Sequence, residues 1–291
     1  MPSSQEHPYS ARSLHFWLEA LRLCRGLNCI ALGILYVAGA HFFEHLPLSS
    51  RLSCKAITWV IISAFAYVYN DLTDYTIDQL NRPSRPLPRG TITLRQAYWV
   101  ASLLGLIALL SIVIFWRADP ILPTTALIAS YAYSKHVRNI SAILANLWTA
   151  STTCLVLLSC QRIPPTTISL ATDLFLVTVL LAREIQKDRM DRAGDIVRRP
   201  RGGAPVVISQ SRGTNTALLG IALCSLAYIV CLGSLTIASQ GLAILVGTLL
   251  FMATILPLIK SSQTVFQIKL LKVVLYCLAV ILLLSTNDHG V

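Results

Sequence analysis

Long segments without a single charged residue constrain this chain more than any other feature. Gln96–Trp116, Ile140–Cys160 and Gly213–Ile259 contain no Asp, Glu, Lys or Arg. Because about 20 apolar residues in a helix span the hydrocarbon core of a bilayer, the first two segments can each cross once. The third can cross twice, with a turn between Gly233 and Gly241. Only 13% of the residues are charged, against about 25% in a soluble domain. We therefore predict a polytopic membrane protein with a single membrane domain over residues 1–291.

The apolar segments predict an all-α bundle of nine transmembrane helices. Their expected ranges are 14–39, 52–80, 94–116, 121–138, 140–160, 166–191, 214–235, 241–259 and 265–286. A polar start, Met1–Arg12, leads into a full-length helix, so no cleavable signal peptide is expected. The eight cysteines are scattered without a CxxC pair, which favours buried apolar residues over disulfides or a zinc site.

Basic residues gather in three short connections between the expected helices. These connections, at 81–95, 135–138 and 192–212, account for much of the net charge of +11. The positive-inside rule places all three loops in the cytosol, at the endoplasmic reticulum if the source is eukaryotic. This explanation of the basic charge leaves little support for nucleic-acid binding. The lipid bilayer is the expected partner, and the oligomeric state is left open.

The first cluster of carboxylates lies at the end of the second expected helix. It reads Asn70-Asp71-Leu-Thr-Asp74-Tyr-Thr-Ile-Asp78. At about 100° per residue, Asn70, Asp74 and Asp78 turn by only about 40° per step, so they form one stripe on the helix.

The second cluster lies at the end of the sixth expected helix. Glu184, Asp188, Asp191 and Asp195 share one face there. Carboxylates four residues apart repel each other, and acidic groups at a helix C-terminus oppose the helix dipole. A divalent cation would relieve both penalties, and oxygen ligands without paired His or Cys favour Mg²⁺ over zinc. Arginines near both clusters suit phosphate oxygens. The pattern predicts a Mg²⁺-dependent site for a diphosphate with a lipid tail.

The segment NDLTDYTIDQLNRPSRPLPRG, residues 70–90, resembles the first signature of UbiA-superfamily prenyltransferases. REIQKDRMDRAGD, residues 183–195, resembles the second, in the form found in the geranylgeranylglyceryl-phosphate branch. The segment 131–138 is similar to the family's Tyr-plus-Lys element, with either Tyr131 and Lys135 or Tyr133 and Arg138 as the pair. Arg25-Gly26-Leu-Asn28 resembles the RPxN element of the first helix.

This resemblance implies a role for each matching position. Asn70, Asp74 and Asp78, with Asp71, would hold one Mg²⁺, and Asp188, Asp191 and Asp195 would hold a second. Asp74, Asp78, Asp191 and Asp195 would be the catalytic carboxylates. The residues implied to bind the diphosphate of a prenyl substrate are Arg25, Arg82, Arg85, Tyr131, Tyr133, Lys135 and Arg138. Pyrophosphate would leave with the help of Mg²⁺, and an allylic cation would remain.

Three departures from the family pattern bear on the fate of that cation. Ala193 replaces a common Glu, the segment 203–205 reads Gly-Ala-Pro in place of Thr-Leu-Pro, and Gly26 replaces the RPxN proline. None affects an implied metal ligand, but together they argue against a standard quinone, haem or archaeal-lipid acceptor. In its size and in these departures, the chain resembles small fungal UbiA-type terpene cyclases. We therefore hypothesise cyclisation of farnesyl or geranylgeranyl diphosphate to a terpene, with prenyl transfer to an aromatic or other lipophilic acceptor as the alternative.

Overall fold

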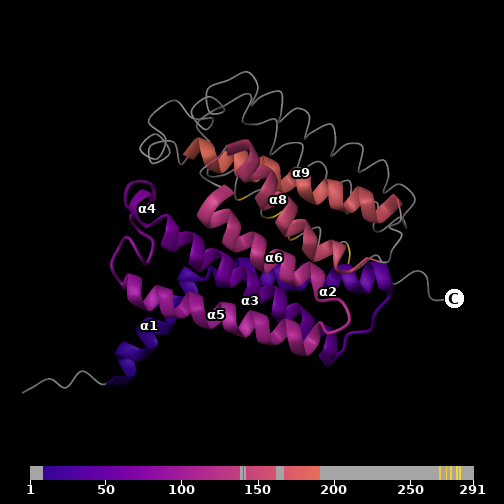
Figure 1. Ribbon diagram of the computed structural model, residues 1–291, viewed down its shortest axis with the longest axis horizontal. Coiled ribbons are helices and arrows are strands. Elements are labelled where there is room, and N and C mark those ends of the chain that lie inside the picture. The colour runs from indigo at the N-terminus through magenta and orange to yellow at the C-terminus, as the bar shows by residue number, and fades with distance from the viewer. Residues whose placement is uncertain are drawn as a thin grey trace, which may run out of the picture.

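A computed structural model describes residues 9–137, 140, 142–161 and 167–190, together with five isolated positions between 269 and 282. Helices account for all the regular structure in these ranges (Figure 1). The expected all-α bundle is confirmed for this part of the chain. The helices predicted at 214–235, 241–259 and 265–286 lie outside it, apart from positions in the last of them.

The first expected helix, 14–39, is in fact two helices. α1 covers Tyr9–Leu23 and α2 covers Gly26–Glu44. The chain breaks at Arg25, whose φ of 53° and ψ of 50° are left-handed. This conformation costs a residue with a Cβ roughly 1–2 kcal/mol. Gly26, which follows directly, is a poor helix former and was the one local signal of the break.

The second expected helix, 52–80, is also divided. α3 covers Ser50–Thr73 and α4 covers Tyr75–Asn81, and they meet at Asp74. Helical hydrogen bonds continue through the junction, from Asp74 N to Asn70 O at 3.0 Å and from Asp78 N to Asp74 O at 2.8 Å. The backbone therefore bends within the predicted stripe of ligands without unwinding there. α3 starts at a cap, where Ser49 Oγ accepts from Leu52 N at 3.3 Å.

The remaining helices agree with the expected ranges to within a few residues, with one difference. α5 covers Leu94–Phe115 and starts with a capping box between Thr93 and Gln96. α6 covers Ile121–Ala132, after which residues 133–137 form a π-helical turn in place of the expected α-helix to 138. α8 covers Ala142–Leu158 and α9 covers Thr167–Met190.

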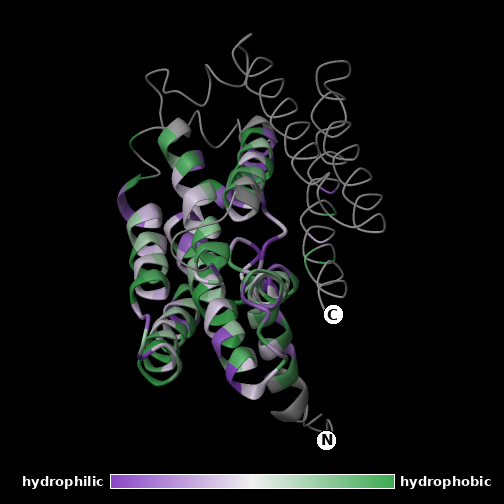
Figure 2. Cartoon of the chain, turned by 90° about the vertical axis from the view of Figure 1, so that its right-hand side faces the viewer, coloured by the Kyte–Doolittle hydropathy of each residue, from purple (hydrophilic) through white to green (hydrophobic). Residues whose placement is uncertain are grey.

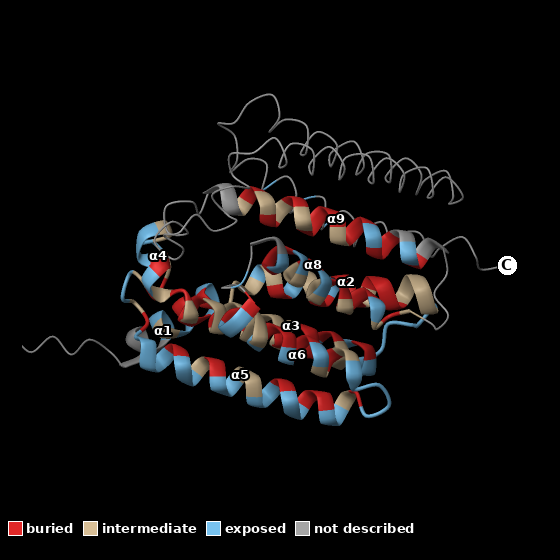
Figure 3. Ribbon diagram, turned by 45° about the horizontal axis from the view of Figure 1, so that its top comes forward, coloured by how far each residue is buried: buried red, intermediate tan, exposed pale blue. Residues whose placement is uncertain are grey.

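α5 shows how the bundle is arranged toward lipid. Small residues face α3, namely Ala97, Ala101, Gly105 and Ala108, and a Cβ placed on Gly105 would lie 3.4 Å from the Phe65 ring. Bulky residues such as Leu109 and Val113 are exposed on the other face. Close packing through small residues with large apolar residues outside is typical of a helix in lipid. Figure 3 shows this alternation of buried and exposed positions along α5.

Three of the described helices, α2, α3 and α5, are long and apolar enough to cross a membrane. Figure 2 shows that hydrophobic residues are spread over the described helices. α2 and α3 approach closely at Gly33, where a Cβ would lie 2.7 Å from Val60 Cγ2. This contact holds α2 against α3. α3 carries the start of the first signature, and α2 begins directly after Arg25.

Candidate active site

A cavity of about 220 Å³ lies among α2, α3, α6, α8 and α9. Its lining changes in character along the helices. At one end it is charged and polar, with Arg25, Asn70, Arg183, Glu184 and Lys187. At the other end its lining consists of Leu35, Trp59, Ala126, Val156 and Leu176. We call the first end the mouth of the cavity and the second its floor. The shape suits a ligand with a charged head and an apolar tail.

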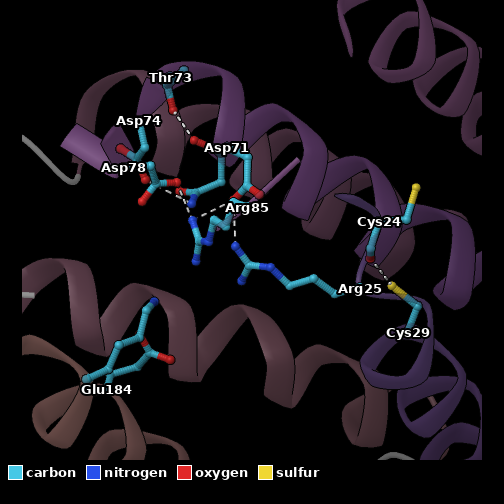
Figure 4. A network of polar contacts seen from close by, with 11 residues as sticks. Cys24, Arg25, Cys29, Asp71, Thr73, Asp74, Asp78, Arg85 and Glu184 are labelled. Carbon is cyan, nitrogen blue, oxygen red and sulfur yellow. Dashed lines mark hydrogen bonds and ion pairs between the residues drawn. The ribbon is translucent and has the colours of Figure 1, made fainter. Parts of the chain in front are cut away.

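Two arginines hold the first carboxylate cluster beside the mouth; of the residues in this network, only Arg25 and Asn70 are among those that line the cavity. Arg25 donates to Asp71 Oδ1 at 2.5 Å, and Arg85 donates to the same oxygen at 3.0 Å. Arg85 also donates to Asp78 Oδ2. Figure 4 shows both guanidinium groups converging on Asp71 from different segments. The left-handed backbone at Arg25 therefore belongs to a site residue, as strained conformations often do.

Burial and charge act against each other in this network. Asp71 is 2% exposed and Asp78 is 4% exposed. Burial raises the pKa of the Asp78 carboxyl above its ordinary value, and the charge of Arg85 opposes part of that rise. Arg25 also lies 4.5 Å from the centre of the Tyr67 ring, which supports its charge from the cavity wall. The repulsion expected among the carboxylates is thus relieved by arginines for Asp71 and Asp78.

The other two members of the cluster pair with each other. Asn70 Nδ2 donates to Asp74 Oδ2 at 3.1 Å, and Asp74 is 1% exposed. In the described ranges, no three His, Cys, Asp or Glu side chains lie close enough to hold a metal ion by themselves. Mg²⁺ is commonly bound by one or two carboxylates together with substrate phosphates. The oxygens of Asn70 and Asp74 are of the kind that would hold Mg²⁺ together with a phosphate-bearing ligand.

α9 brings a second charged group to the mouth. Glu184 is 3% exposed and accepts from Arg183 Nη1 at 3.2 Å and from Lys187 Nζ at 3.1 Å. Figure 4 places Glu184 across the site from the arginine network. The predicted ligands Asp191 and Asp195 and the predicted phosphate contact Arg138 lie outside the described residues, as does the side chain of Asp188.

The Tyr-plus-Lys segment divides between the cavity and the outside. Tyr133 lines the cavity, whereas Tyr131 and Lys135 are exposed and are not among its lining residues. Lys135 Nζ donates to the Tyr131 hydroxyl at 3.0 Å, and the Tyr131 ring stacks on Tyr69 with centroids 5.1 Å apart. Arg82, another predicted phosphate contact, caps the end of α4 and is half-buried.

Serines and threonines between the mouth and the floor turn their hydroxyl hydrogens away from the cavity. Each donates to a backbone carbonyl of its own helix, as Thr152 does to Trp148 O at 2.7 Å. The others are Ser63, Ser130, Ser134, Thr149 and Thr153. The Trp148 indole likewise donates to Ala129 O at 3.0 Å. These walls therefore present methyl groups, rings and oxygen lone pairs to a ligand.

Some lining residues could not be identified from sequence alone. Arg183 and Lys187 flank Glu184 in the second signature. Their charges can be read from the sequence, but nothing in the neighbouring residues indicates that their side chains face the cavity. Trp59 lies eleven residues before Asn70 in an ordinary apolar helix. Its spacing from Asn70 is the signal that could have identified it. Eleven residues are close to three helical turns, so the two residues lie on the same face of the helix.

Comparisons with known proteins concern the family and the fold of the chain. Residues 27–269 match the UbiA prenyltransferase family. The digeranylgeranylglyceryl phosphate synthase of Pyrococcus horikoshii is 29% identical over 235 residues, covering 78% of this chain and 78% of that protein. The corresponding protein of Thermococcus sibiricus is 30% identical over 178 residues, covering 60% of this chain and 63% of that protein, which is less than two thirds of its length.

A solved structure also has the same fold. The UbiA homologue from Archaeoglobus fulgidus, bound to GPP and Mg²⁺, is similar with a TM-score of 0.64 at 16% identity. The likeness covers 92% of this chain and 99% of that one.

Proposed function

The chain belongs to the UbiA prenyltransferase family, and on this premise we propose that it is a Mg²⁺-dependent membrane enzyme that transfers a prenyl group from its diphosphate to a lipophilic acceptor. The observation that carries the proposal is the polarity of the cavity. Three cations and one carboxylate of the described residues line the mouth, namely Arg25, Arg183, Lys187 and Glu184, and apolar and aromatic side chains form the floor. The names of the relatives support prenyl transfer, the alternative of the sequence analysis, more than the cyclisation that it favoured.

At the mouth, the residues of this chain bind and orient the diphosphate. Arg25 and Arg85 already hold anionic oxygens, and Arg183 and Lys187 face them from α9. Asn70 and Asp74 would hold Mg²⁺, with Asp188, Asp191 and Asp195 as the second set that the signature implies. When bound, Mg²⁺ stabilises the negative charge that develops on the leaving oxygens. The arginines stabilise the same charge through fixed hydrogen bonds.

The bond between prenyl C1 and the bridging oxygen breaks, and its electron pair leaves with pyrophosphate. The allylic cation is left among side chains that exclude water, and Tyr67 and Trp148 present rings toward it. An acceptor oxygen or carbon then forms a bond to C1 and loses a proton. We expect the mouth to face the cytosol, as the distribution of basic loops indicates.

A second candidate, cyclisation of the prenyl chain, is favoured by one observation. The wall hydroxyls donate within their own helices, so the middle of the cavity has few donors with which to orient an acceptor. Their lone pairs and the neighbouring rings could instead stabilise a cation as it moves along a folded chain.

One experiment separates the two outcomes. Purified protein in lipid would be incubated with farnesyl or geranylgeranyl diphosphate and Mg²⁺, with and without a lipophilic glycerol phosphate or an aromatic acid. Transfer predicts a prenylated product only when an acceptor is added. Formation of a cyclic hydrocarbon without added acceptor would mean that the enzyme is a cyclase and not a transferase. The absence of pyrophosphate release in every mixture would refute both.

A further inference from the structure

One carboxylate, that of Glu184 on α9, lies among the cations at the mouth. Of the described residues that line the cavity, Arg25, Arg183 and Lys187 are cationic and Glu184 alone is anionic. The described carboxylates of the first signature are not among the lining residues. On charge alone, an anion at this place would oppose the binding of a diphosphate. Attraction of the substrate therefore does not explain Glu184.

Both oxygens of Glu184 are engaged by cations of its own helix. Oε1 accepts from Arg183 Nη1 at 3.2 Å, and Oε2 accepts from Lys187 Nζ at 3.1 Å. At about 100° per residue, the three positions fall within about 100° of the helix circumference, so they share one face. The Glu184 side chain is 4% exposed, against 16% for Arg183 and 27% for Lys187. The anion is buried, and the two cations that it holds are more accessible.

Glu184 keeps two cations together that would otherwise move apart. Arg183 and Lys187 are four residues apart on one helical face, and like charges at that spacing repel each other. Each side chain also has many rotamers, which it loses when it is held in one position. Because Glu184 binds both, they are ordered before a ligand arrives. Preorganised cations can stabilise charge on a ligand without first having to rearrange.

Arg183 also has a donor that Glu184 does not use. Its Nε is buried and has no acceptor among the residues that the structure describes. Buried donors in proteins nearly always have an acceptor. Since Arg183 lines the cavity, an oxygen of a bound ligand can supply the one that is missing. A guanidinium group held at Nη1 by a carboxylate keeps Nε for a phosphate oxygen.

The same geometry separates Glu184 from the implied metal ligands. By spacing, Glu184 continues the stripe of Asp188, Asp191 and Asp195, the second set of implied Mg²⁺ ligands. Its two oxygens, however, accept from a guanidinium and an ammonium group. A Mg²⁺ ion bound to the same carboxylate would be repelled by both. The charge of Glu184 therefore serves the two cations.

We propose that Glu184 is a positioning residue, which holds Arg183 and Lys187 together as a paired binding site for the diphosphate and is not itself a ligand of Mg²⁺. The inference rests on the proposed prenyl diphosphate chemistry and names the residue that organises the α9 side of the mouth. Arg183 and Lys187 bind the leaving pyrophosphate, and Glu184 acts through them. Its contribution falls on kcat, because the cations must be aligned when charge develops on the leaving oxygens.

The test compares wild type with Glu184→Gln in lipid, by pyrophosphate release from farnesyl or geranylgeranyl diphosphate at varied Mg²⁺. Glutamine has the same shape, but its amide nitrogen cannot accept from a cation, so one of the two cations is released. We expect kcat to fall about tenfold or more, while KM and the Mg²⁺ concentration for half-maximal rate stay close to the wild-type values. An unchanged kcat in the folded variant, even with a lower Tm, would show a merely structural role and overturn the inference.

Glu19→Gln is the matched control. Glu19 is also a buried glutamate that accepts from Arg89 and pairs with Arg22, but it does not line the cavity. Its kcat should stay close to that of wild type. A fall in kcat as large as that of Glu184→Gln would mean that loss of any buried carboxylate charge impairs the enzyme, and would overturn the inference.

Lys187→Gln tests whether Glu184 acts through its neighbours. Once the lysine is removed, one of the two cations remains to be positioned, so adding Glu184→Gln should lower kcat by a smaller factor than in wild type. An equal factor in both backgrounds would overturn the inference. A higher Mg²⁺ requirement of Glu184→Gln would also overturn it, because that result would make Glu184 a metal ligand.

The double variant Glu184→Gln/Lys187→Gln loses one charge of each sign, so it keeps the net charge of wild type and replaces Glu184→Gln if that variant does not fold. Its kcat should then be below that of Lys187→Gln at the same Mg²⁺ requirement. An equal kcat or a higher requirement would overturn the inference. The absence of pyrophosphate release by wild type from either diphosphate would instead refute the proposed function and the inference together.

Discussion

The mouth and the floor of the cavity are held together by different forces. At the mouth, charged side chains from distant parts of the chain pair with one another, as Arg25 and Asp71 do across 46 residues. At the floor, the Trp59 ring packs edge-to-face on Trp116, and the neighbouring side chains that line the cavity are apolar. Packed rings have one arrangement, whereas ion pairs can exchange partners. We infer from this difference that the mouth can accept new ions, whereas the floor keeps a single arrangement.

When substrate and metal bind, the charged side chains at the mouth would exchange their present partners for the new ions, and every buried charge would stay compensated. Removing one partner of a buried ion pair is strongly destabilising, because it leaves an uncompensated charge. A diphosphate with Mg²⁺ brings an anion for Arg25 and Arg85 and a cation for the carboxylates at the same time. The resting network thus occupies, with its own side chains, the positions that we propose for substrate and metal.

The largest effect should come from the mouth. Asp74→Ala removes a carboxylate proposed to hold Mg²⁺, so we expect turnover to fall by about 10³-fold or more. Pyrophosphate release from wild type and variant, with and without EDTA, measures it. Asp119→Ala is the control, because Asp119 is an exposed carboxylate near the end of the α5–α6 connection. If EDTA left the turnover of wild type undiminished, the proposed role of Mg²⁺ at the mouth would be wrong.

A smaller effect is expected from Arg85→Gln, which removes one donor to the leaving group and should lower kcat by about 10²-fold. It also leaves Asp71 and Asp78 with less compensation, so its Tm should fall. Arg117→Gln, an exposed arginine after α5, should change neither quantity.

The double variant Arg85→Gln/Asp78→Asn separates the two roles of Arg85. It removes the charges of Arg85 and Asp78 together and leaves the pair between Arg25 and Asp71 in place, so Tm should recover while kcat stays low. Recovery of kcat along with Tm would mean that Arg85 serves only the balance of charge within the fold.

The smallest effect concerns a buried carboxylate of α1 that does not line the cavity. Glu19 of α1 is fully buried and accepts from Arg89 at 2.6 Å and from Thr91 at 2.8 Å, and it also pairs with Arg22. Burial acts to raise the pKa of Glu19, but these hydrogen bonds outweigh it and lower the pKa below its ordinary value.

A lowered pKa gives Glu19 a contribution to stability that is complete above the ordinary glutamate value of about 4.3 and is lost as pH falls through the folded value. Tm of wild type in detergent should therefore fall more steeply below about pH 4.3 than Tm of Glu19→Gln. Parallel pH profiles for the two proteins would show that the contact between α1 and the loop 82–93 does not depend on this charge.

Much of the site could be predicted because the relevant signals are local. The stripe of Asn70, Asp74 and Asp78 follows from helical periodicity, and the signatures around it are long and strict. Which cation compensates each carboxylate is a long-range property. The Arg25 backbone turns left-handed and directs its side chain to Asp71, and no spacing in the sequence encodes that turn.

The sequence by itself determined the membrane class and the positions of most of the described helices, because hydrophobic length acts within a few turns of helix. Only the tertiary structure decided that Tyr133 faces the cavity while Tyr131 and Lys135 do not, that α3 bends at Asp74, and that Trp59 lies at the floor. Periodicity defines the faces of a helix but not which face meets a neighbour. The rotation and packing of each helix decide that, and they depend on contacts such as Gly33 with Val60, between residues far apart in the chain.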